Sequence, residues 1–243
     1  MTGVAAVTSV AEVIREGPVL NQLKRLLPDR AVPMRVWRGP FRGARVVMNP
    51  RASLRKAFGL YEHELNGWLD RALSRVSRVL DVGANDGYFT LGSAAAFRRL
   101  GIAGDLVAFE PQARYVAQLT AAIRAQQPSA MRFTVVPSMV GRQAGPGSTT
   151  LDAWPAVDRT NTLIKIDVEG GELDVIAGGL SWVADSNVFV IEVHHEQYLA
   201  ELVAIFRERG QALVQVNQRP LPILGSDTRE ATNWWLVSDL GLQ

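Results

Sequence analysis

The chain has 243 residues, of which 47% are hydrophobic and 21% charged, with a net charge of +2; this composition fits one globular domain with a full core and excludes a disordered chain. Cysteine is absent, which excludes disulfide bonds, thiolate metal sites and cysteine nucleophiles. No apolar run reaches the roughly 18 residues of a membrane span, and Glu12 and Glu16 interrupt the segment that a signal peptide would keep apolar, so we expect a soluble, cytoplasmic protein.

Residues 1–75 are predicted to form a helical and hairpin extension packed on the core. Weak amphipathic patterns over 4–15 and 19–27 indicate helices, Gly39 and Pro40 indicate the turn of a hairpin, and a further helical pattern begins at Tyr61. The extension carries 13 Lys and Arg against 6 Asp and Glu. Because lysine is rare in the whole chain, we interpret this as an arginine-rich solvated surface rather than as a contact with nucleic acid or an acidic acceptor.

From residue 76 to residue 243, short apolar runs alternate with helical ones, which predicts one α/β domain. The apolar runs begin at residues 78, 105, 132, 162, 188, 212 and 233. One helix is predicted after the first run and ends at Leu100, and three more are predicted over 112–126, 171–179 and 196–209. Strands that are almost entirely apolar indicate a parallel sheet covered on both faces. Only a loop separates the last two runs, so we expect them to pair antiparallel at the end of the sheet.

The first strand of this domain runs into a glycine turn, LDVGANDGYFT, that contains an unexpected acid. Gly83 and Gly87 let the backbone approach a ligand closely, and the following helix offers free amides. In the dinucleotide fingerprint the position of Asp81 is ordinarily apolar, and a glycine stands at the position of Asn85. Because a carboxylate repels pyrophosphate, Asp81 fits a cationic ligand with an amino group, such as S-adenosylmethionine.

The second strand ends in AFEP, which places Glu110 where a carboxylate accepts hydrogen bonds from both hydroxyls of a ribose. The alternative is that Asp81 and Glu110 are structural acids that only hold their turns. Their occurrence together, each at the end of its strand, favours a ligand site.

Four segments in this order resemble the FkbM family of class I S-adenosylmethionine-dependent methyltransferases: VLDVGANDGYFT, AFEP, LIKIDVEGGELDVIAGG and VIEVHHE. GLYEHEL at Gly59 resembles a short Tyr-Glu motif upstream in that family. The resemblance covers about 59–195 and implies a Rossmann-like sheet of seven strands, the last antiparallel, with helices on both faces. The cofactor-binding residues that it implies are Tyr61, Glu62, Asp81, Gly83, Asn85, Gly87, Glu110, Ser138 and Asp167, with Ser138 near the adenine.

A buried strand, LIKID, ends in charged residues, and charges are costly to bury unless they are paired. In this topology the strand lies next to the first one, so Asp167 is expected within reach of the transferred methyl group. Lys165 and Glu169 point the same way as Asp167 if the alternation of the strand continues. Glu169 and Glu172 are expected to serve only the dipole of the following helix.

The fifth strand is expected to bring Glu192 and His194 to the same edge. A hydroxyl acceptor loses its proton as it attacks, which requires a nearby base. His194 is the first candidate for the base and Asp167 the second, while Lys165 orients or polarises the acceptor. The alternative for His194 is a backbone cap.

Asp167, Glu192 and His194 also offer the ligand types of a divalent cation such as Mg²⁺. A bound cation would hold and acidify a pair of sugar hydroxyls. The spacing in the sequence does not decide between a base and a metal site, because the residues lie on separate strands.

The sequence thus predicts an O-methyltransferase that acts on a hydroxyl of a small metabolite or carbohydrate. Two alternatives are an NAD-dependent oxidoreductase and a non-catalytic binding module that uses the basic N-terminal segment. We expect no nucleic-acid partner. The N-terminal extension is expected to cover the active site or to form a homodimer.

Overall fold

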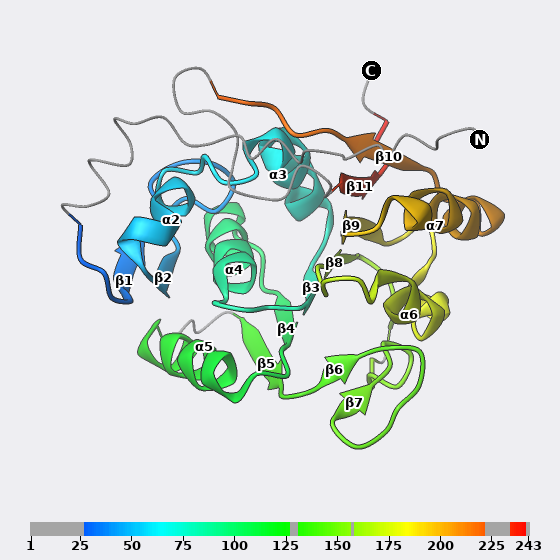
Figure 1. The fold of residues 1–243 in the computed structure, drawn as a ribbon, viewed down its shortest axis with the longest axis horizontal. Coiled ribbons are helices and arrows are strands. Elements are labelled where there is room, and N and C mark those ends of the chain that lie inside the picture. The colour runs from blue at the N-terminus through cyan, green and yellow to red at the C-terminus, as the bar shows by residue number, and fades with distance from the viewer. Residues whose placement is uncertain (1–26, 127–130, 157, 222–233, 242–243) are drawn as a thin grey trace, which may run out of the picture.

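The structure is a computed structural model that describes residues 27–126, 131–156, 158–221 and 234–241. A twisted sheet forms the middle of the molecule, with helices on both faces (Figure 1). The helix predicted over 4–15, and the one predicted over 19–27 apart from its last residue, lie outside the described residues. Within the described part of the chain, no helix is long and apolar enough to cross a bilayer.

The strands of the central sheet are β3 (Arg78–Val82), β4 (Asp105–Phe109), β5 (Arg132–Val136), β8 (Thr162–Ile166), β9 (Val188–Val193), β10 (Leu213–Val216) and β11 (Trp234–Ser238). The helices are α2 (Pro50–Ala57), α3 (Asn66–Arg75), α4 (Tyr88–Leu100), α5 (Ala113–Gln126), α6 (Glu172–Ala177) and α7 (Glu196–Glu208), with short 3₁₀ turns η1 (His63–Leu65) and η2 (Leu180–Trp182). Two small pairs complete the described elements: β1 (Val32–Arg35) with β2 (Arg45–Met48), and β6 (Met139–Val140) with β7 (Ser148–Thr149).

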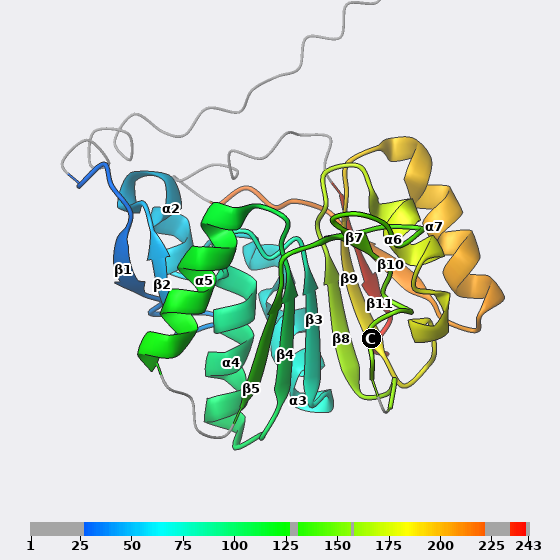
Figure 2. The ribbon, with the colours of Figure 1, turned by 90° about the horizontal axis from the view of Figure 1, so that it is seen from below.

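The described residues form a seven-stranded sheet in the order β10-β11-β9-β8-β3-β4-β5. β11 pairs antiparallel with both β9 and β10, and the other pairs in the sheet are parallel. The predicted fold, with its antiparallel last strand, is therefore confirmed. Figure 2, a view across the sheet, shows these strands side by side.

The alternation of the strands divides the core between the two faces of the sheet. Val79 and Leu163 pack against α3 and α4 on one face, whereas Leu80 and Ile164 pack against α6 and α7 on the other. By the same alternation, the buried side chains of Asp81, Lys165 and Glu192 lie on the α3 and α4 face. Three charges thus enter an otherwise apolar layer near the carboxyl ends of their strands.

The N-terminal extension contains the predicted hairpin and one helix that the sequence reading missed. β1 and β2 pair antiparallel with Arg35 opposite Arg45, and Gly39 in the connection has a φ of 77°. The missed helix, α2, begins after Asn49, whose side chain accepts a hydrogen bond from the backbone N–H of Arg51. The cap residue followed by Pro50 is a signal for a helix start that was available in the sequence.

The extension packs on the sheet domain through aromatic residues. The ring of Phe41 contacts the ring of Tyr88 edge to face at 5.2 Å, and the indole N–H of Trp68 donates to the backbone carbonyl of Ser238 at 2.9 Å. The division of the chain after residue 75 stays a prediction.

Candidate functional site

The glycine turn after β3 brings three strands together at one edge of the sheet. Gly83 has a φ of 80°, and its backbone N–H donates to the carbonyl of Phe109 at the end of β4. A Cβ atom at this position would lie 1.9 Å from the backbone oxygen of Asp167, which follows β8. Glycine is therefore required here both by its backbone conformation and by the close approach of the neighbouring chain.

Glu110 is fixed at the same edge by backbone amides. One carboxylate oxygen accepts from the N–H of Asn85 and the other from the N–H of Gln112, each at 2.8 Å. The side chain is only 3% exposed. Each oxygen keeps a further lone pair for a ligand hydroxyl, which is the geometry that ribose binding needs.

These residues line a pocket of about 340 Å³, a volume in the range of small-molecule sites. It lies between the turns that follow β3, β4 and β5 and the segment that follows β8. Five of the predicted cofactor residues are in its lining: Gly83, Asn85, Glu110, Ser138 and Asp167. The side chain of Met139, also in the lining, is 58% exposed and offers an apolar surface to a ligand.

A larger pocket, of about 590 Å³, lies at the opposite edge of the sheet. Its lining includes Val188, which starts β9, and Ala212, which precedes β10. None of the predicted site residues lines it. Size alone therefore does not identify the functional pocket.

Two of the predicted cofactor residues stand behind the 340 Å³ pocket rather than in its lining. Gly87 faces α5, where a Cβ atom would lie 2.6 Å from the side chain of Leu119. Asp81 is fully buried and accepts a hydrogen bond from the hydroxyl of Thr90 on α4 at 2.5 Å. Burial raises the pKa of Asp81, and the neighbouring Lys165 and Thr90 oppose this rise.

Lys165 links the two parts of the site. Its ammonium group donates to the backbone oxygen of Gly83 at 2.7 Å and lies 3.4 Å from a carboxylate oxygen of Asp81, its cross-strand neighbour, and 3.2 Å from one of Asp167. Burial alone would lower the pKa of Lys165, but the carboxylates of Asp167 and Asp81 raise it above its ordinary value. Lys165 is therefore a positive charge enclosed between two acids.

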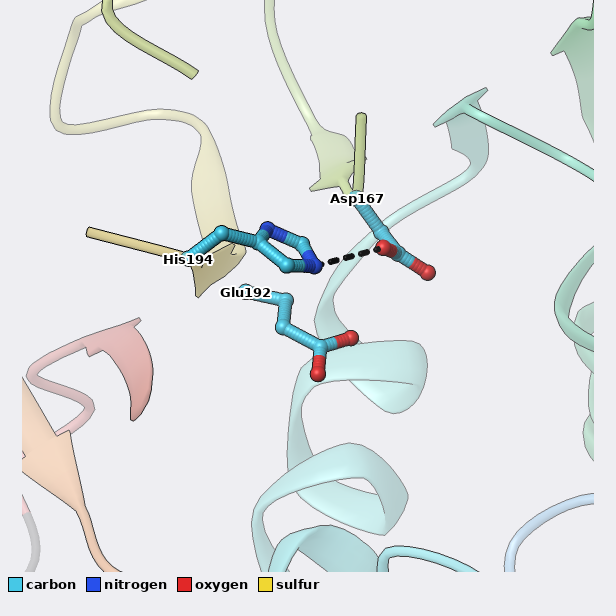
Figure 3. Close-up of side chains that lie close together, drawn as sticks. All are labelled: Asp167, Glu192 and His194. Carbon is cyan, nitrogen blue, oxygen red and sulfur yellow. Dashed lines mark ion pairs between the residues drawn. The ribbon is translucent and has the colours of Figure 1, made fainter. Parts of the chain in front are cut away.

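Asp167, Glu192 and His194 meet at the carboxyl ends of β8 and β9 (Figure 3). One potential ligand atom from each of the three residues lies within 4.8 Å of the others. The Nε2 atom of His194 lies 3.9 Å from the Oδ1 atom of Asp167. Since Asp167 also lines the pocket, one carboxylate belongs to both parts of the site.

Glu172 has a role that the sequence reading missed. Its side chain is fully buried, and its Oε1 atom lies 2.6 Å from the Nδ1 atom of His194. The hydrogen bond with Glu172 is the main reason why the pKa of His194 is raised. Burial opposes this rise, and the charges of nearby acids add to it. Glu172 lies in the first turn of α6, as expected, and its carboxylate in addition contacts the imidazole of His194.

The alternation of β8 does not continue to Glu169. The strand ends at Ile166, and Glu169 has a φ of 50° in the left-handed region. Glu169 lines the pocket but lies outside the cluster of Asp167, Glu192 and His194, and it precedes the first residue of α6. Its expected place in the first turn of that helix was wrong.

Tyr61 and Glu62 approach the same cluster from the N-terminal extension. Burial raises the pKa of Tyr61 well above its ordinary value, with further contributions from the charges of Glu62, Glu192 and Asp167. Glu62 has a φ of 50°. A strained backbone at this point fits a residue held by its surroundings.

An ion pair that could not be foreseen from the sequence, between Lys56 and Asp86, supports the glycine turn after β3. The ammonium group of Lys56 lies 2.7 Å from the carboxylate of Asp86 and about 5 Å from the ring centroids of Tyr61 and Tyr88. Asp86 also accepts from the backbone N–H of Tyr88 at 3.0 Å. The helix that the sequence reading overlooked thus supports the glycine turn.

Comparison with protein families gives one match, to the methyltransferase FkbM domain, over residues 81–213. A comparison with curated proteins gives no match. The matched segment begins at the acid of β3 and ends at the start of β10, so it contains the pocket and the cluster.

Among solved structures, the chain is similar to the methyltransferase FkbM from Methylobacillus flagellatus KT, with 16% identity and a TM-score of 0.52 over 68% of this chain and 44% of that one. The chain therefore spans less than half the length of that relative. It is also similar to precorrin-6y C5,15-methyltransferase from Geobacter metallireducens GS-15 (16% identity, TM-score 0.44, 70% and 86% covered). The N-terminal domain of human METTL16 in complex with SAH is a further match (16% identity, TM-score 0.46, 72% and 68% covered).

Proposed function

The chain belongs to the FkbM family of class I methyltransferases, and on that premise we propose that it transfers a methyl group from S-adenosylmethionine to a hydroxyl of a small metabolite or carbohydrate. The observation that carries this proposal is the shared position of Asp167. The residue lines the pocket that contains Gly83 and Glu110, and it also faces the imidazole of His194. A methyl donor in the pocket would thus lie beside groups that act on an acceptor.

The residues in the pocket fit the proposed methyl donor. The carboxylate of Glu110 would bind the ribose hydroxyls, and the backbone of Gly83 and Asn85, where a side chain on Gly83 would not fit, would hold the methionine part. Ser138 and Met139 would lie against the adenine, and Tyr61 and Glu62 would close the pocket from the other side. The sulfonium of the bound donor supplies an electrophilic methyl group.

Asp81 and Lys165 act from behind the pocket. Asp81 is enclosed by Thr90 and Lys165, and the Lys165 ammonium is bonded to the turn at Gly83. We therefore assign both residues to positioning the turn and Asp167, rather than to contact with the acceptor. Gly87 likewise serves the packing of the turn against α5.

The cluster would remove the acceptor's proton. As the acceptor oxygen forms its bond to the methyl carbon and the carbon–sulfur bond breaks, the hydroxyl proton passes to a base within hydrogen-bond reach. Glu172 holds the Nδ1 atom of His194, so the Nε2 atom is the nitrogen that faces Asp167. His194 is the first candidate for this base and Asp167 the second. A divalent cation such as Mg²⁺ is the alternative means of acidifying the hydroxyl.

Membership of a methyltransferase family disfavours the alternative of an NAD-dependent oxidoreductase. Asn85 in place of the middle glycine of the dinucleotide fingerprint points the same way. The alternative of a non-catalytic binding module predicts salt-dependent binding to RNA or DNA without methyl transfer.

Calorimetry followed by a transfer assay tests the proposal. We expect the purified chain to bind S-adenosylmethionine and S-adenosylhomocysteine and to show no binding of NAD. A screen of hydroxylated metabolites and oligosaccharides with a labelled methyl donor, analysed by mass spectrometry, should then give an O-methylated product. Binding of NAD without binding of S-adenosylhomocysteine would contradict the proposal, and so would a product methylated only on nitrogen.

A further inference from the structure

We propose that Asp167, Glu192 and His194 form a binding site for a divalent cation of the oxygen-preferring class, such as Mg²⁺ or Mn²⁺. The proposal rests on the proposed function and deepens it, because the cation would hold and acidify the acceptor hydroxyl beside the methyl donor. Of the two roles left open for the cluster, it selects the metal site over the general base. The acidified hydroxyl would then pass its proton to solvent water as its oxygen bonds to the methyl carbon and the carbon–sulfur bond breaks.

The first argument is convergence. The three donor atoms come from the segment after β8, from β9 and from the residue that follows β9, and they lie within 4.8 Å of one another (Figure 3). Adjacent ligands of an octahedral Mg²⁺ lie about 3 Å apart, as follows from its short metal–oxygen distances. Binding of the cation would therefore draw the three donor atoms closer together than they lie in the structure. The side chain of Asp167 is 31% exposed, so a cation has access from the pocket.

The second argument is that other side chains already contact one atom of His194 and one atom of Asp167, which leaves the facing atoms for a cation. Glu172, which is not part of the cluster, contacts the Nδ1 atom of His194 at 2.6 Å. Lys165 lies 3.2 Å from the Oδ2 atom of Asp167. The Nε2 and Oδ1 atoms are therefore the ones turned toward each other. A carboxylate on the outer nitrogen of a histidine is the arrangement that orients metal-binding imidazoles.

The third argument is charge. Lys165 is ion-paired with both Asp81 and Asp167, so its single charge is shared by two carboxylates. Glu172 is fully buried and Glu192 is 4% exposed. Buried carboxylates gathered at one point are stabilised by cations, and a divalent ion supplies two positive charges where the donor atoms meet.

The ligand types determine the class of ion. Two of the three donors are carboxylate oxygens, which suit Mn²⁺ or Mg²⁺, and the remaining positions would be open to water or an acceptor oxygen. Within the whole sequence there is no cysteine to supply a thiolate for a softer metal.

The test measures metal binding directly. The full chain is stripped with a chelator and titrated with Mn²⁺, and the free ion is followed by electron paramagnetic resonance, with and without S-adenosylhomocysteine. We expect one Mn²⁺ per chain. Glu192→Gln and His194→Asn should each weaken Mn²⁺ binding at least tenfold, and Glu172→Gln, which alters the outer contact, about tenfold. Glu201→Gln on the exposed side of α7 removes the same charge elsewhere and should leave binding unchanged.

The outcomes separate the metal site from the proposed function. Absence of Mn²⁺ binding, or binding that both Glu192→Gln and His194→Asn leave unchanged, overturns the metal site even if S-adenosylhomocysteine binds. Metal binding that follows the expected pattern without binding of S-adenosylhomocysteine supports the site and overturns the proposed function. Thermal unfolding of each variant shows whether it is folded. If a variant at a buried position does not fold, Asp167→Asn, at a partly exposed position, replaces it in the test.

Discussion

The proposed site has two halves that hold their acids in different ways: a proposed cofactor half around Gly83 and Glu110, and a proposed acceptor half formed by Asp167, Glu192 and His194. In the cofactor half, Glu110 is fixed by the backbone amides of Asn85 and Gln112, and Gly83 is fixed by the chain that passes beside it. In the acceptor half, side chains hold side chains: Lys165 faces Asp167, and Glu172 holds His194. The cofactor half thus depends mainly on turn geometry, whereas the acceptor half depends on charges contributed by separate strands.

These two kinds of support suit different functions. Backbone groups keep their positions whatever the protonation state of neighbouring side chains, which suits binding of the same donor in every turnover. A cluster of mutually dependent charges responds strongly to the loss of one member, which suits chemistry on an acceptor. Lys165 and Asp167 connect the two halves, so residues away from that junction test the difference. Substitution of His194 should affect turnover, whereas substitution of Gly83 or Glu110 should affect folding or cofactor binding.

The largest effect is expected in the acceptor half. His194→Asn should lower kcat by about 10² to 10⁴-fold, because the cluster that deprotonates or acidifies the acceptor hydroxyl then lacks one of its three members. The affinity for S-adenosylhomocysteine, measured by calorimetry, should stay within about threefold, because His194 does not line the pocket.

The neighbouring His195→Asn is the matched control, since His195 is exposed and packs on Tyr198. It should leave kcat nearly unchanged. An equal loss of cofactor affinity and turnover in His194→Asn would show that the two halves are not separable.

A substitution in the turn should instead break the fold of the cofactor half. In Gly83→Ala the new methyl group meets the backbone oxygen of Asp167, and we expect a loss of about 3 kcal/mol or more in the free energy of unfolding, measured in urea. Gly101→Ala is the control, because Gly101 also has a positive φ but has open space around it. It should cost about 1 kcal/mol. Equal costs would mean that the close approach to β8 does not matter.

A smaller effect, on affinity alone, is expected at the ribose position. Glu110→Gln should weaken S-adenosylhomocysteine binding about tenfold, because the carboxylate loses its charge and one of its two accepting oxygens becomes an NH₂ group that cannot accept a hydrogen bond. The value of kcat at saturating cofactor should change little. Asp105→Asn, at the other end of β4, should leave both quantities unchanged. A fall in kcat that exceeds the fall in affinity would place Glu110 in the chemical step.

A comparable effect, on stability rather than on affinity, is expected at Asp81 behind the pocket. Thr90→Val removes the hydroxyl that donates to this buried carboxylate and should cost about 1 to 2 kcal/mol of unfolding free energy at pH 8. Burial raises the pKa of Asp81, and Thr90 opposes the rise. An acid with a raised folded pKa lowers stability above that pKa, and this penalty fades as the pH falls through it.

The difference in unfolding free energy between Thr90→Val and the unsubstituted chain should therefore become smaller as the pH is lowered. Ser93→Ala on the same helix is the control, because the buried hydroxyl of Ser93 makes no hydrogen bond within the described residues. It should be close to neutral at every pH. A gap that is independent of pH would show that the hydroxyl contributes through packing rather than through the charge of Asp81.

The fold and the turns that carry Gly83 and Glu110 could be predicted from the amino-acid sequence. Apolar runs alternating with helical ones specify a covered parallel sheet, and the turn at Gly83 and the acid at Glu110 follow directly after their strands. In such cases the signal is local, because a glycine turn or a strand end is encoded by adjacent residues. The overlooked helix from Pro50 was equally local, with its capping Asn49 in plain view.

The contacts within the proposed acceptor half could not be predicted from the sequence and are known only from the folded structure. The contact of Glu172 with His194, the enclosure of Lys165 between Asp81 and Asp167, and the end of the alternation before Glu169 depend on how strands far apart in sequence align. Residue types give the sign of each charge, but the free energy of an ion pair depends on distance and burial. Those two quantities are fixed only when β3, β8 and β9 take their register beside one another.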